Sequence, residues 1–379
     1  MYIITYAKMN NHTCEKCGKN FTEKSKYAAH LKRKTSCIAL TFDIIEEPDY
    51  EPDAVININT FDHLVGSTLT TVPKPILKWV GGKTQILDTL IQQYPVHINN
   101  YREIFLGGGS MLLALLKYKK DGIIKVHGQI YAYDLNEPLI GVYKNIQSCH
   151  NELFAEITRI IAEFNSCNAQ NGLLNRTPKT LEEALKLKEN YYYWTRILYN
   201  KLSLEQKTSV LGSAMFIFLN KTCFRGVFRV GPNGFNVPYG HYDNPEIINE
   251  AHLNAIHELI QGVIFECSDF TNSLSNVEEN DFVYLDPPYA PETATSFVKY
   301  TDAGFPVETH LALFGLCHDL THSNKKFMLS NADVSLVRDN FTAAIHSSYN
   351  QNIKSISCRR AINSKNPDAK AKEVIIRNY

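Results

Sequence analysis

Short apolar runs alternate with helical patterns along most of this chain. Runs of strand length occupy six segments, at residues 129–134, 263–267, 282–285, 326–331, 344–349 and 373–377. Each run predicts a buried strand. A seventh strand-like segment lies at residues 101–106 and is followed by three glycines at residues 107–109. The apolar stretch at residues 111–116 then predicts a buried helix. Strands that alternate with helices in this way favour a doubly wound α/β fold.

One long segment interrupts the alternation. Residues 139–255 carry amphipathic patterns of helical period, for example over residues 153–161 and 181–202. Residues 222–242 differ again, because they are rich in Gly, Pro, Asn, Arg and aromatic side chains, which predicts an ordered hairpin or loop. We therefore expect an inserted, mostly helical subdomain with this loop at its tip.

Composition narrows the class of protein. The 379 residues allow two or three domains with an ample core. Lysine plus arginine balance aspartate plus glutamate at 39 each, so net charge gives no sign of a nucleic-acid partner. The sequence shows no charged-then-apolar leader and no apolar run of membrane-spanning length, and its nine cysteines are an odd number. We expect an intracellular protein of the cytoplasm or nucleus, in a reducing compartment, without a membrane partner.

The N-terminal segment has its own chemistry. Residues 1–40 hold eight basic residues and two acidic ones, whereas residues 43–53 hold six acidic residues and no basic one. Cys14, Cys17, His30 and Cys37 follow the spacing of a zinc finger whose last histidine is replaced by cysteine. We predict a zinc finger over residues 1–40 with one structural zinc ion, a linker over residues 41–73 and a catalytic body over residues 74–379. The basic residues favour phosphate contacts, and a finger that binds protein is the alternative.

The finger also gives a hint about source. Fingers with this cysteine and histidine spacing resemble ones found in proteins of large DNA viruses. A viral protein that acts in the host cell is therefore one expectation for this chain.

The tetrapeptide Asp286-Pro287-Pro288-Tyr289 directly follows the apolar run at residues 282–285. Two prolines stop a strand, remove two backbone donors and hold the chain extended. The Asp286 carboxylate and the Pro287 carbonyl can then accept hydrogen bonds from an exocyclic amine, while the Tyr289 ring stacks on the base that carries it. A strand followed by a plain proline turn is the alternative.

Two glycine segments suggest a nucleotide-like ligand. Around residues 107–109 the dinucleotide spacing fails because residue 112 is leucine, and around Lys83 the phosphate-loop spacing fails because residue 77 is leucine. Trp79 and Lys83 instead match a ligand with a flat ring and a carboxylate. Asp134 ends the predicted strand at residues 129–134, the next strand after the glycine turn. Doubly wound folds bind ribose hydroxyls at that place, and a local capping role is the alternative.

In their order and spacing these blocks resemble the DNA adenine-N6 methyltransferases of the Dam type (class alpha, D12), over about residues 75–379. The resemblance implies a Rossmann-like mixed sheet with its last strands antiparallel, and the insert at residues 139–255 as target-recognition subdomain. It also implies S-adenosylmethionine as cofactor. The cofactor-binding residues that it implies are Trp79, Lys83, Phe105, Gly107, Gly109, Asp134, Asp269, Phe270 and Asp286. For Asp269 and Phe270 a plain turn at the end of a strand is the alternative.

The resemblance also implies a mechanism and a DNA surface. Asp286, Pro287, Pro288 and Tyr289 would serve direct attack of adenine N6 on the cofactor methyl, after the base has rotated out of the duplex. The DNA-binding residues would be Phe224, Arg225, Arg229, Asn236 and Pro238, with Phe224 as a wedge and Arg229 reading guanine. For the arginines a phosphate contact is the alternative. Arg225 stands where members that read GATC carry asparagine, so the target sequence stays open.

Two other functions compete with this interpretation. A methyltransferase that acts on an RNA base or a protein amide nitrogen can use the same Pro-Pro-Tyr chemistry, and a non-catalytic zinc-finger regulator can retain a degenerate methyltransferase body. The long insert favours double-stranded DNA as the partner, and the presence of Lys83, Asp134 and Asp286 favours catalysis. A cognate restriction endonuclease is a further candidate partner, and we expect a monomer or weak dimer.

Overall fold

The chain divides into two compact units, Met1–Ile58 and Asn59–Tyr379. The computed structural model describes residues 12–13, 20–21, 27–28, 71–167, 172–291, 305–359 and 370–379. In the first unit, β1 (His12–Thr13) pairs antiparallel with β2 (Asn20–Phe21). The four predicted zinc ligands, Cys14, Cys17, His30 and Cys37, lie outside the described residues.

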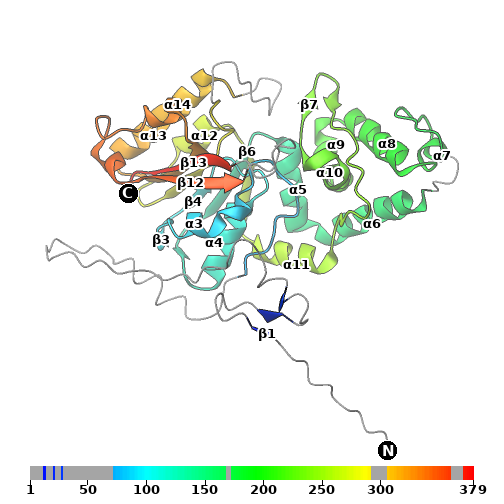
Figure 1. Ribbon diagram of the computed structural model, residues 1–379, viewed down its shortest axis with the longest axis horizontal. Helices are drawn as coiled ribbons and strands as arrows, with labels where there is room; N and C mark the ends of the chain where they lie inside the picture. Colours follow the sequence, from blue (N-terminus) through cyan, green and yellow to red (C-terminus); the bar gives the residue numbers. More distant parts are fainter. Residues whose placement is uncertain are drawn as a thin grey trace, which may run out of the picture. The chain divides into compact units, whose positions relative to one another are not determined.

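The second unit is an α/β fold built on a mixed seven-stranded sheet (Figure 1). Its strand order is β12-β13-β11-β10-β4-β6-β9. The strands are β4 (Tyr101–Glu103), β6 (Ile130–Asp134), β9 (Val263–Cys267), β10 (Phe282–Leu285), β11 (Lys326–Ala332), β12 (Ile353–Arg359) and β13 (Lys370–Arg377). Five strands, β4, β6, β9, β10 and β11, are parallel to one another. Strand β13 runs antiparallel to both β11 and β12. The predicted antiparallel end of the sheet is confirmed.

Each face of the sheet has its own apolar core. On one face α3 (Leu87–Ile91), α4 (Ser110–Lys120) and α5 (Glu137–Ser148) pack against the strands, and on the other α12 (Phe270–Ser275) and α13 (Val307–His322) do so. Figure 1 shows α12, α13 and α14 (Ser335–Arg338) on one side of the strands and α3 and α4 on the other. All four residues of β10 are buried, because its two faces are both covered.

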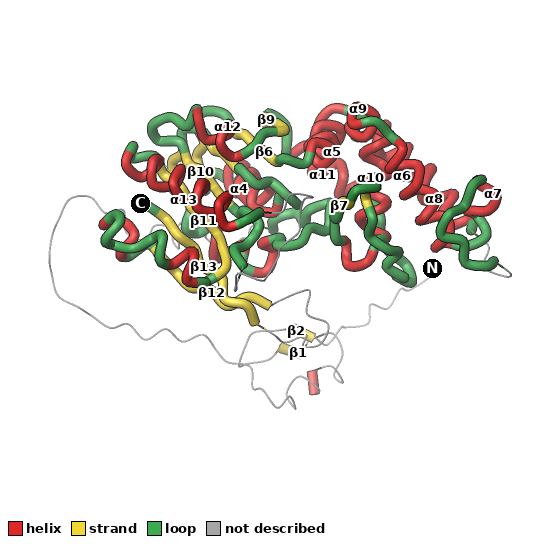
Figure 2. Tube along the Cα trace, turned by 90° about the horizontal axis from the view of Figure 1, so that it is seen from above, coloured by secondary structure: helices red, strands yellow, loops and turns green. Residues whose placement is uncertain are grey.

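The remaining helices form the greater part of the segment between β6 and β9. They are α6 (His150–Ser166), α7 (Leu181–Ala184), α8 (Lys188–Lys201), α9 (Leu204–Thr208), α10 (Val210–Thr222) and α11 (Glu250–Leu259). Figure 2 shows α6 to α9 gathered at one end of this unit, away from β12 and β13. Helix α10 lies at their centre, since residues 212–220 are buried without interruption. A short hairpin, β7 (Val230–Gly231) and β8 (Gly234–Phe235), follows it.

Five of the six apolar runs are strands, as predicted, but the strand predicted at residues 344–349 is wrong. Ser347–Asn350 is a short 3-10 helix, and the strand begins only at Ile353. Ile345 is 41 % exposed, whereas the Tyr349 ring is buried and its hydroxyl lies 2.8 Å from Thr321 Oγ1 on α13. The apolar side chains of this segment therefore anchor a turn against a helix rather than covering a sheet.

Three small pieces complete the described second unit. A 3-10 turn covers Lys83–Gln85, and β3 (His97–Ile98) pairs with β5 (Lys125–Val126) in parallel. A further 3-10 turn, Phe224–Gly226, leads from α10 towards the β7–β8 hairpin.

Candidate active site

The order in which the chain adds strands to the sheet reverses between β4 and β10. From β4 the chain continues to β6 and β9 on one side, and from β10 it continues to β11 on the other. In open α/β sheets ligands bind at the carboxyl ends of the strands that flank such a switch point. The glycine turn after β4 and the Asp286-Pro287-Pro288-Tyr289 segment after β10 both lie there.

The glycine turn is held closely from two sides. Gly107 and Gly109 have positive φ values of 50° and 71°, and Gly109 caps the N-terminus of α4. A Cβ atom at Gly107 would lie 2.8 Å from the Trp79 ring, and one at Gly109 would lie 2.7 Å from the Tyr143 hydroxyl. Both positions therefore require glycine, for backbone conformation and for space.

Asp134, at the end of β6, supports the same turn. Its Oδ2 accepts a hydrogen bond from the Gly107 N–H at 2.9 Å, and its Oδ1 accepts one from the Asn136 N–H at 2.9 Å. Burial raises the pKa of Asp134, and these backbone donors lower it in part. The carboxylate is thus a local cap that also fixes the glycine turn, and its oxygens line the carboxyl edge of the sheet.

Asp286 and Lys83 form a buried ion pair. Lys83 Nζ lies 2.7 Å from Asp286 Oδ2 and also donates to the Gly81 carbonyl at 2.6 Å. The Lys83 side chain is 3 % exposed and that of Asp286 18 %. Asp286 Oδ1 is buried and has no hydrogen-bond partner among the described residues. Burial raises the pKa of Asp286 to about 6, while Lys83 opposes the shift.

Tyr289 has a charged neighbour at its hydroxyl and another at its ring. Its hydroxyl donates to Glu373 Oε2 on β13 at 2.6 Å, and Lys83 Nζ lies 5.0 Å from the centre of its ring. The next residue, Ala290, donates its N–H to Asn331 Oδ1 on β11 at 2.9 Å. Asn331 Nδ2 is buried without a partner among the described residues.

Glu103 also belongs to this site, and sequence reasoning missed it. It ends β4, is 2 % exposed and accepts a hydrogen bond from the Tyr101 hydroxyl at 2.7 Å. Burial raises its pKa to about 8; Asp286 adds to the rise and Lys83 opposes it. An acid at the end of a strand, four residues before a glycine turn, was a signal present in the sequence.

Asp269 and Phe270 follow β9, the next strand along the edge. Asp269 caps α12, because its Oδ1 accepts from the Thr271 and Asn272 N–H groups at 2.8 and 3.0 Å. The Phe270 ring lies 6.2 Å from that of Phe105, which precedes the glycine turn. The structure therefore brings together the rings of two predicted cofactor residues, while Asp269 has the local capping role.

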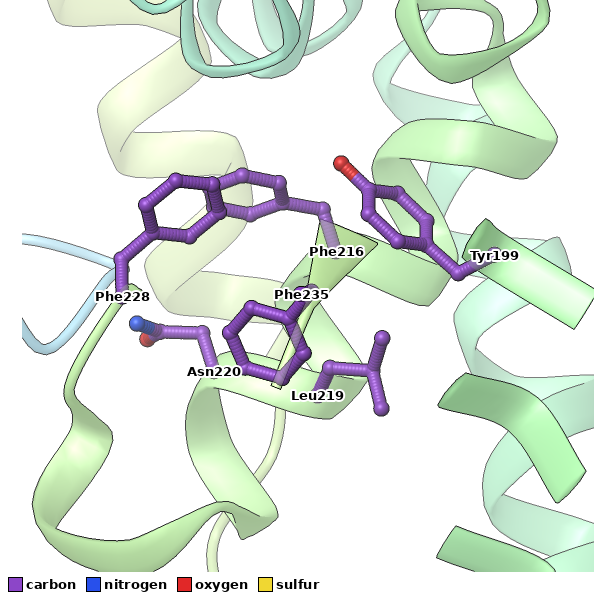
Figure 3. Close-up of a pocket in the computed structure, with 6 residues that line it drawn as sticks. All are labelled: Tyr199, Phe216, Leu219, Asn220, Phe228 and Phe235. Atoms are coloured by element: carbon purple, nitrogen blue, oxygen red, sulfur yellow. The ribbon is translucent and has the colours of Figure 1, made fainter. Parts of the chain in front are cut away.

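Trp79 connects the glycine turn to the helical segment. The Trp79 side chain packs so closely on the glycine turn that a Cβ atom at Gly107 would lie 2.8 Å from the indole and one at Gly108 would lie 2.9 Å from the Trp79 Cβ. The Trp79 ring stacks on Phe228 with centroids 5.6 Å apart. Phe228 in turn stacks on Phe216 at 5.1 Å (Figure 3). Figure 3 shows the small pocket next to this stack, which six side chains line: Tyr199, Phe216, Leu219, Asn220, Phe228 and Phe235.

The predicted DNA-binding residues lie on the turn after α10 and on the β7–β8 hairpin. The Phe224 ring is 48 % exposed, and Arg225 has a left-handed backbone with φ 58°. Arg229 Nε donates to Asn236 Oδ1 at 2.6 Å, and the Pro238 carbonyl accepts from the Phe224 N–H at 2.8 Å. Hydrogen bonds thus join two pairs of these residues, Phe224 with Pro238 and Arg229 with Asn236.

Two classes of feature are absent from the described part of the chain. Its residues include no group of three or more His, Cys, Asp or Glu side chains placed to hold a metal ion. Among the same residues, no helix combines the length and the apolar character that crossing a membrane requires.

Fold and site together define an α/β enzyme with a glycine turn and an acidic Pro-Pro-Tyr segment at its switch point. The family model of the D12 class N6 adenine-specific DNA methyltransferases matches residues 79–362. The chain belongs to this family, and it transfers a methyl group to N6 of adenine in DNA. Membership implies S-adenosylmethionine as the methyl donor.

Three relatives illustrate the match. The chain is 34 % identical over 316 residues to type II methyltransferase M.MjaIII of Methanocaldococcus jannaschii, covering 81 % of this chain and 99 % of the relative. It is 28 % identical to type II methyltransferase M1.LlaDCHI of Lactococcus lactis subsp. cremoris, with 81 % and 95 % covered. It is 26 % identical to the DNA adenine methylase of Escherichia coli K12, again with 81 % and 95 % covered.

Proposed function

We propose that Asp286, the Pro287 carbonyl and Tyr289 bind the target adenine of a short, specific duplex sequence after it has rotated out of the helix. The observation that carries this proposal is Asp286 Oδ1, a buried acceptor without a partner among the described residues, at the switch point of the sheet. An unpaired buried acceptor is costly, so its retention favours a ligand donor such as the adenine amine. Tyr289 stacks on the extruded base.

The residues at the edge of the sheet fit S-adenosylmethionine. The glycine turn admits a close backbone approach at Gly107 and Gly109, Asp134 lies where ribose hydroxyls need acceptors, and Phe270 offers an apolar ring. The complete proposed set is Trp79, Lys83, Phe105, Gly107, Gly109, Asp134, Asp269, Phe270 and Asp286. When bound, the cofactor supplies an electrophilic methyl group on a sulfonium.

The protein's contribution to the chemistry is positioning and desolvation. Asp286 and the Pro287 carbonyl orient the two amine protons, which directs the nitrogen lone pair towards the donor. With the cofactor held by these residues, the amine would form its N–CH3 bond as the S–CH3 bond breaks and the neutral thioether leaves, with no covalent bond to the protein. Asp286 does not need to be a strong base, because the N–H proton becomes acidic only once the methyl group has been transferred. Lys83 keeps Asp286 ionised at neutral pH despite its burial.

We propose that residues 139–255 form the target-recognition subdomain of a catalytic body over residues 74–379. The exposed Phe224 ring fills the gap that the extruded base leaves in the stack. Arg229 reads guanine, and its bond to Asn236 holds the guanidinium in one orientation. Arg225 and Pro238 complete the surface. The N-terminal zinc finger, with Cys14, Cys17, His30 and Cys37 as its zinc ligands, adds phosphate contacts through its basic residues. Residues 41–73 act as a linker.

Type II methyltransferases among the relatives motivate a second part of the proposal. The chain protects a short sequence against a cognate restriction endonuclease and acts as a monomer or weak dimer. Single-molecule sequencing of DNA from cells that express the protein reads the modified base and the target sequence together. An N6-methyladenine without a fixed sequence context would contradict the proposed site specificity.

The test of the proposed site is Asp286→Ala. Loss of an acceptor for the amine affects the transition state more than the ground state, so methyl transfer should fall at least a hundredfold while DNA affinity stays within threefold. Asp88→Ala, which removes an exposed acid on α3, is the matched control and should keep full activity. Activity of Asp286→Ala within tenfold of the parent would refute the assignment.

A further inference from the structure

The catalytic segment is attached to the antiparallel end of the sheet by two side chains. The Tyr289 hydroxyl donates to Glu373 on β13, and the Ala290 N–H donates to Asn331 on β11. Ala332 on β11 is paired with Glu373 on β13, so the two acceptors come from neighbouring positions of one strand pair. Two hydrogen bonds thus fix consecutive residues of the segment, one through a side chain and one through the backbone.

Asn331 has a fixed orientation. Its Oδ1 accepts from both the Ala290 and the Ala332 N–H groups, at 2.9 and 2.8 Å, and the side chain is fully buried. The backbone directly after Tyr289 is therefore anchored, but this anchor leaves the torsions of the Tyr289 side chain open. The hydrogen bond to Glu373 is the contact that restricts them, because it ties the far end of the ring.

The tyrosine ring lies between two opposite charges. Lys83 Nζ lies 5.0 Å from the ring centre, and the Glu373 carboxylate binds the hydroxyl. The same Lys83 pairs with Asp286, so the orientation of the ring is tied to that of the carboxylate. Burial, with Asp286 and Glu373 nearby, raises the pKa of Tyr289 well above its usual value, so the hydroxyl stays a donor.

We infer that Glu373 is a positioning residue for methyl transfer, which acts by holding the Tyr289 ring in the orientation that stacks on the target adenine. Glu373 does not touch the reacting atoms. A ring that is fixed before the base arrives does not have to be ordered during binding, and small misplacements of a reacting group reduce the rate strongly. The inference rests on the proposed stacking role of Tyr289.

The test combines variants at both ends of this hydrogen bond. Glu373→Ala should lower the single-turnover rate about tenfold, while the dissociation constants for DNA and S-adenosylmethionine stay within threefold. Tyr289→Phe, which keeps the ring and removes the hydroxyl, should lower the rate to a similar extent. The double variant should be no slower than either single variant, because all three lack the same bond. Glu373→Gln keeps an acceptor oxygen and should restore the rate to within threefold of the parent.

Two controls separate positioning from general damage. Glu266→Ala removes an exposed glutamate from β9 of the same sheet and should leave the rate unchanged. Thermal unfolding shows whether Glu373→Ala is folded, and if it is not, Glu373→Gln and Tyr289→Phe still test the bond.

The inference is overturned if the single-turnover rate of Glu373→Ala stays within twofold of the parent rate. It is also overturned if adding Glu373→Ala to Tyr289→Phe lowers the rate by the same factor as adding it to the parent. Tyr289→Ala distinguishes these failures from a failure of the proposed function. A hundredfold loss in Tyr289→Ala with a fully active Glu373→Ala refutes only the role of Glu373. A fully active Tyr289→Ala refutes the stacking role itself.

Discussion

At the scale of single residues, the chemistry of the site depends on one ion pair that is almost removed from water. Burial disfavours the ionised form of Asp286, and Lys83, 2.7 Å away, favours it. The balance leaves the pKa at about 6, so the carboxylate form predominates at neutral pH. The acceptor that the amine needs is present under ordinary conditions, but it is lost under mild acid.

This balance predicts the pH dependence of methyl transfer. The value of kcat/KM should fall as pH decreases through about 6, because protonated Asp286 loses an acceptor. Removing the ammonium in Lys83→Met leaves burial unopposed, raises the pKa of Asp286 and should move this acidic limb to higher pH. Initial rates between pH 5 and 8.5 measure both profiles. Lys119→Met, at an exposed lysine on α4, should leave the limb in place; a limb that does not move in Lys83→Met would exclude the assigned coupling.

Glu103 gives a second prediction at this scale, on stability. Its pKa rises from 4.5 to about 8 on folding, so the folded protein holds a proton that the unfolded chain releases. The resulting stabilisation is complete below pH 4.5 and is lost as pH rises to about 8. Glu103→Gln stays neutral, so its free energy of unfolding relative to the parent should rise between pH 5 and pH 8.

One unit of pKa shift corresponds to about 1.4 kcal/mol, and we expect the change in relative stability to exceed about 1 kcal/mol. Urea unfolding at the two pH values measures it. The exposed Glu266→Gln is the control and should show the same relative stability at both pH values. An equal difference between Glu103→Gln and the parent at pH 5 and pH 8 would mean that Glu103 is ionised in the folded state.

At the scale of elements, an aromatic stack joins two parts that the sequence separates. The Trp79 indole fits against the glycine turn on one side and against Phe228 on the other. Phe228 immediately precedes Arg229 and lies three residues after Arg225. The backbone that carries the proposed DNA contacts is therefore packed, through a single indole, against the turn that carries the proposed cofactor contacts.

This packing predicts that Phe228→Ala weakens both stability and cofactor binding. Loss of a half-buried ring from the stack should lower the free energy of unfolding by about 1 to 3 kcal/mol. It should also raise the dissociation constant for S-adenosylmethionine several-fold, because Trp79 is then free to move away from Gly107. Urea unfolding and calorimetry measure the two effects.

Phe224→Ala is the matched control for that experiment. Its ring is 48 % exposed, so stability and cofactor affinity should not change. Methylation of DNA should fall instead, because the proposed wedge is lost. If Phe228→Ala binds the cofactor as tightly as the parent, the stack is structural only.

At the scale of the whole molecule, the family match lies entirely within the compact second unit. The match covers residues 79–362, and the unit covers Asn59–Tyr379. The three relatives align with about four fifths of this chain. The catalytic machinery described above lies within this part, and the proposed zinc finger precedes it.

Deletion of residues 1–72 should therefore preserve specificity and turnover on short duplexes. DNA association should become weaker, with a smaller dependence on salt, because basic phosphate contacts are lost. Metal analysis should find about one zinc ion per full chain and none in the truncated protein. Cys17→Ser in the full chain should lose the zinc and keep turnover. A truncated enzyme that methylates a different sequence would show that the finger reads bases.

Local sequence patterns predicted much of the fold. The run at residues 282–285 is a strand because continuous apolar sequence of that length must be covered on both faces, whereas the strand at residues 263–267 lies at the edge of the sheet and exposes Glu266 and Cys267. The strand predicted at residues 344–349 was wrong because Tyr349 is buried against α13. The spacing of apolar residues along the chain does not predict that contact. Local apolar character thus indicates burial, but not the surface that provides it.

The sequence by itself determined the chemistry at the strand ends: an acid, two prolines and a tyrosine after one strand, and a glycine turn after another. Only the tertiary structure decided which side chains contact these residues. Lys83 meets Asp286 across 203 positions of sequence, and Glu373 meets Tyr289 across 84. The reason is physical, since backbone conformation follows from neighbours along the chain, whereas charge pairing and pKa depend on distances that only the assembled sheet sets.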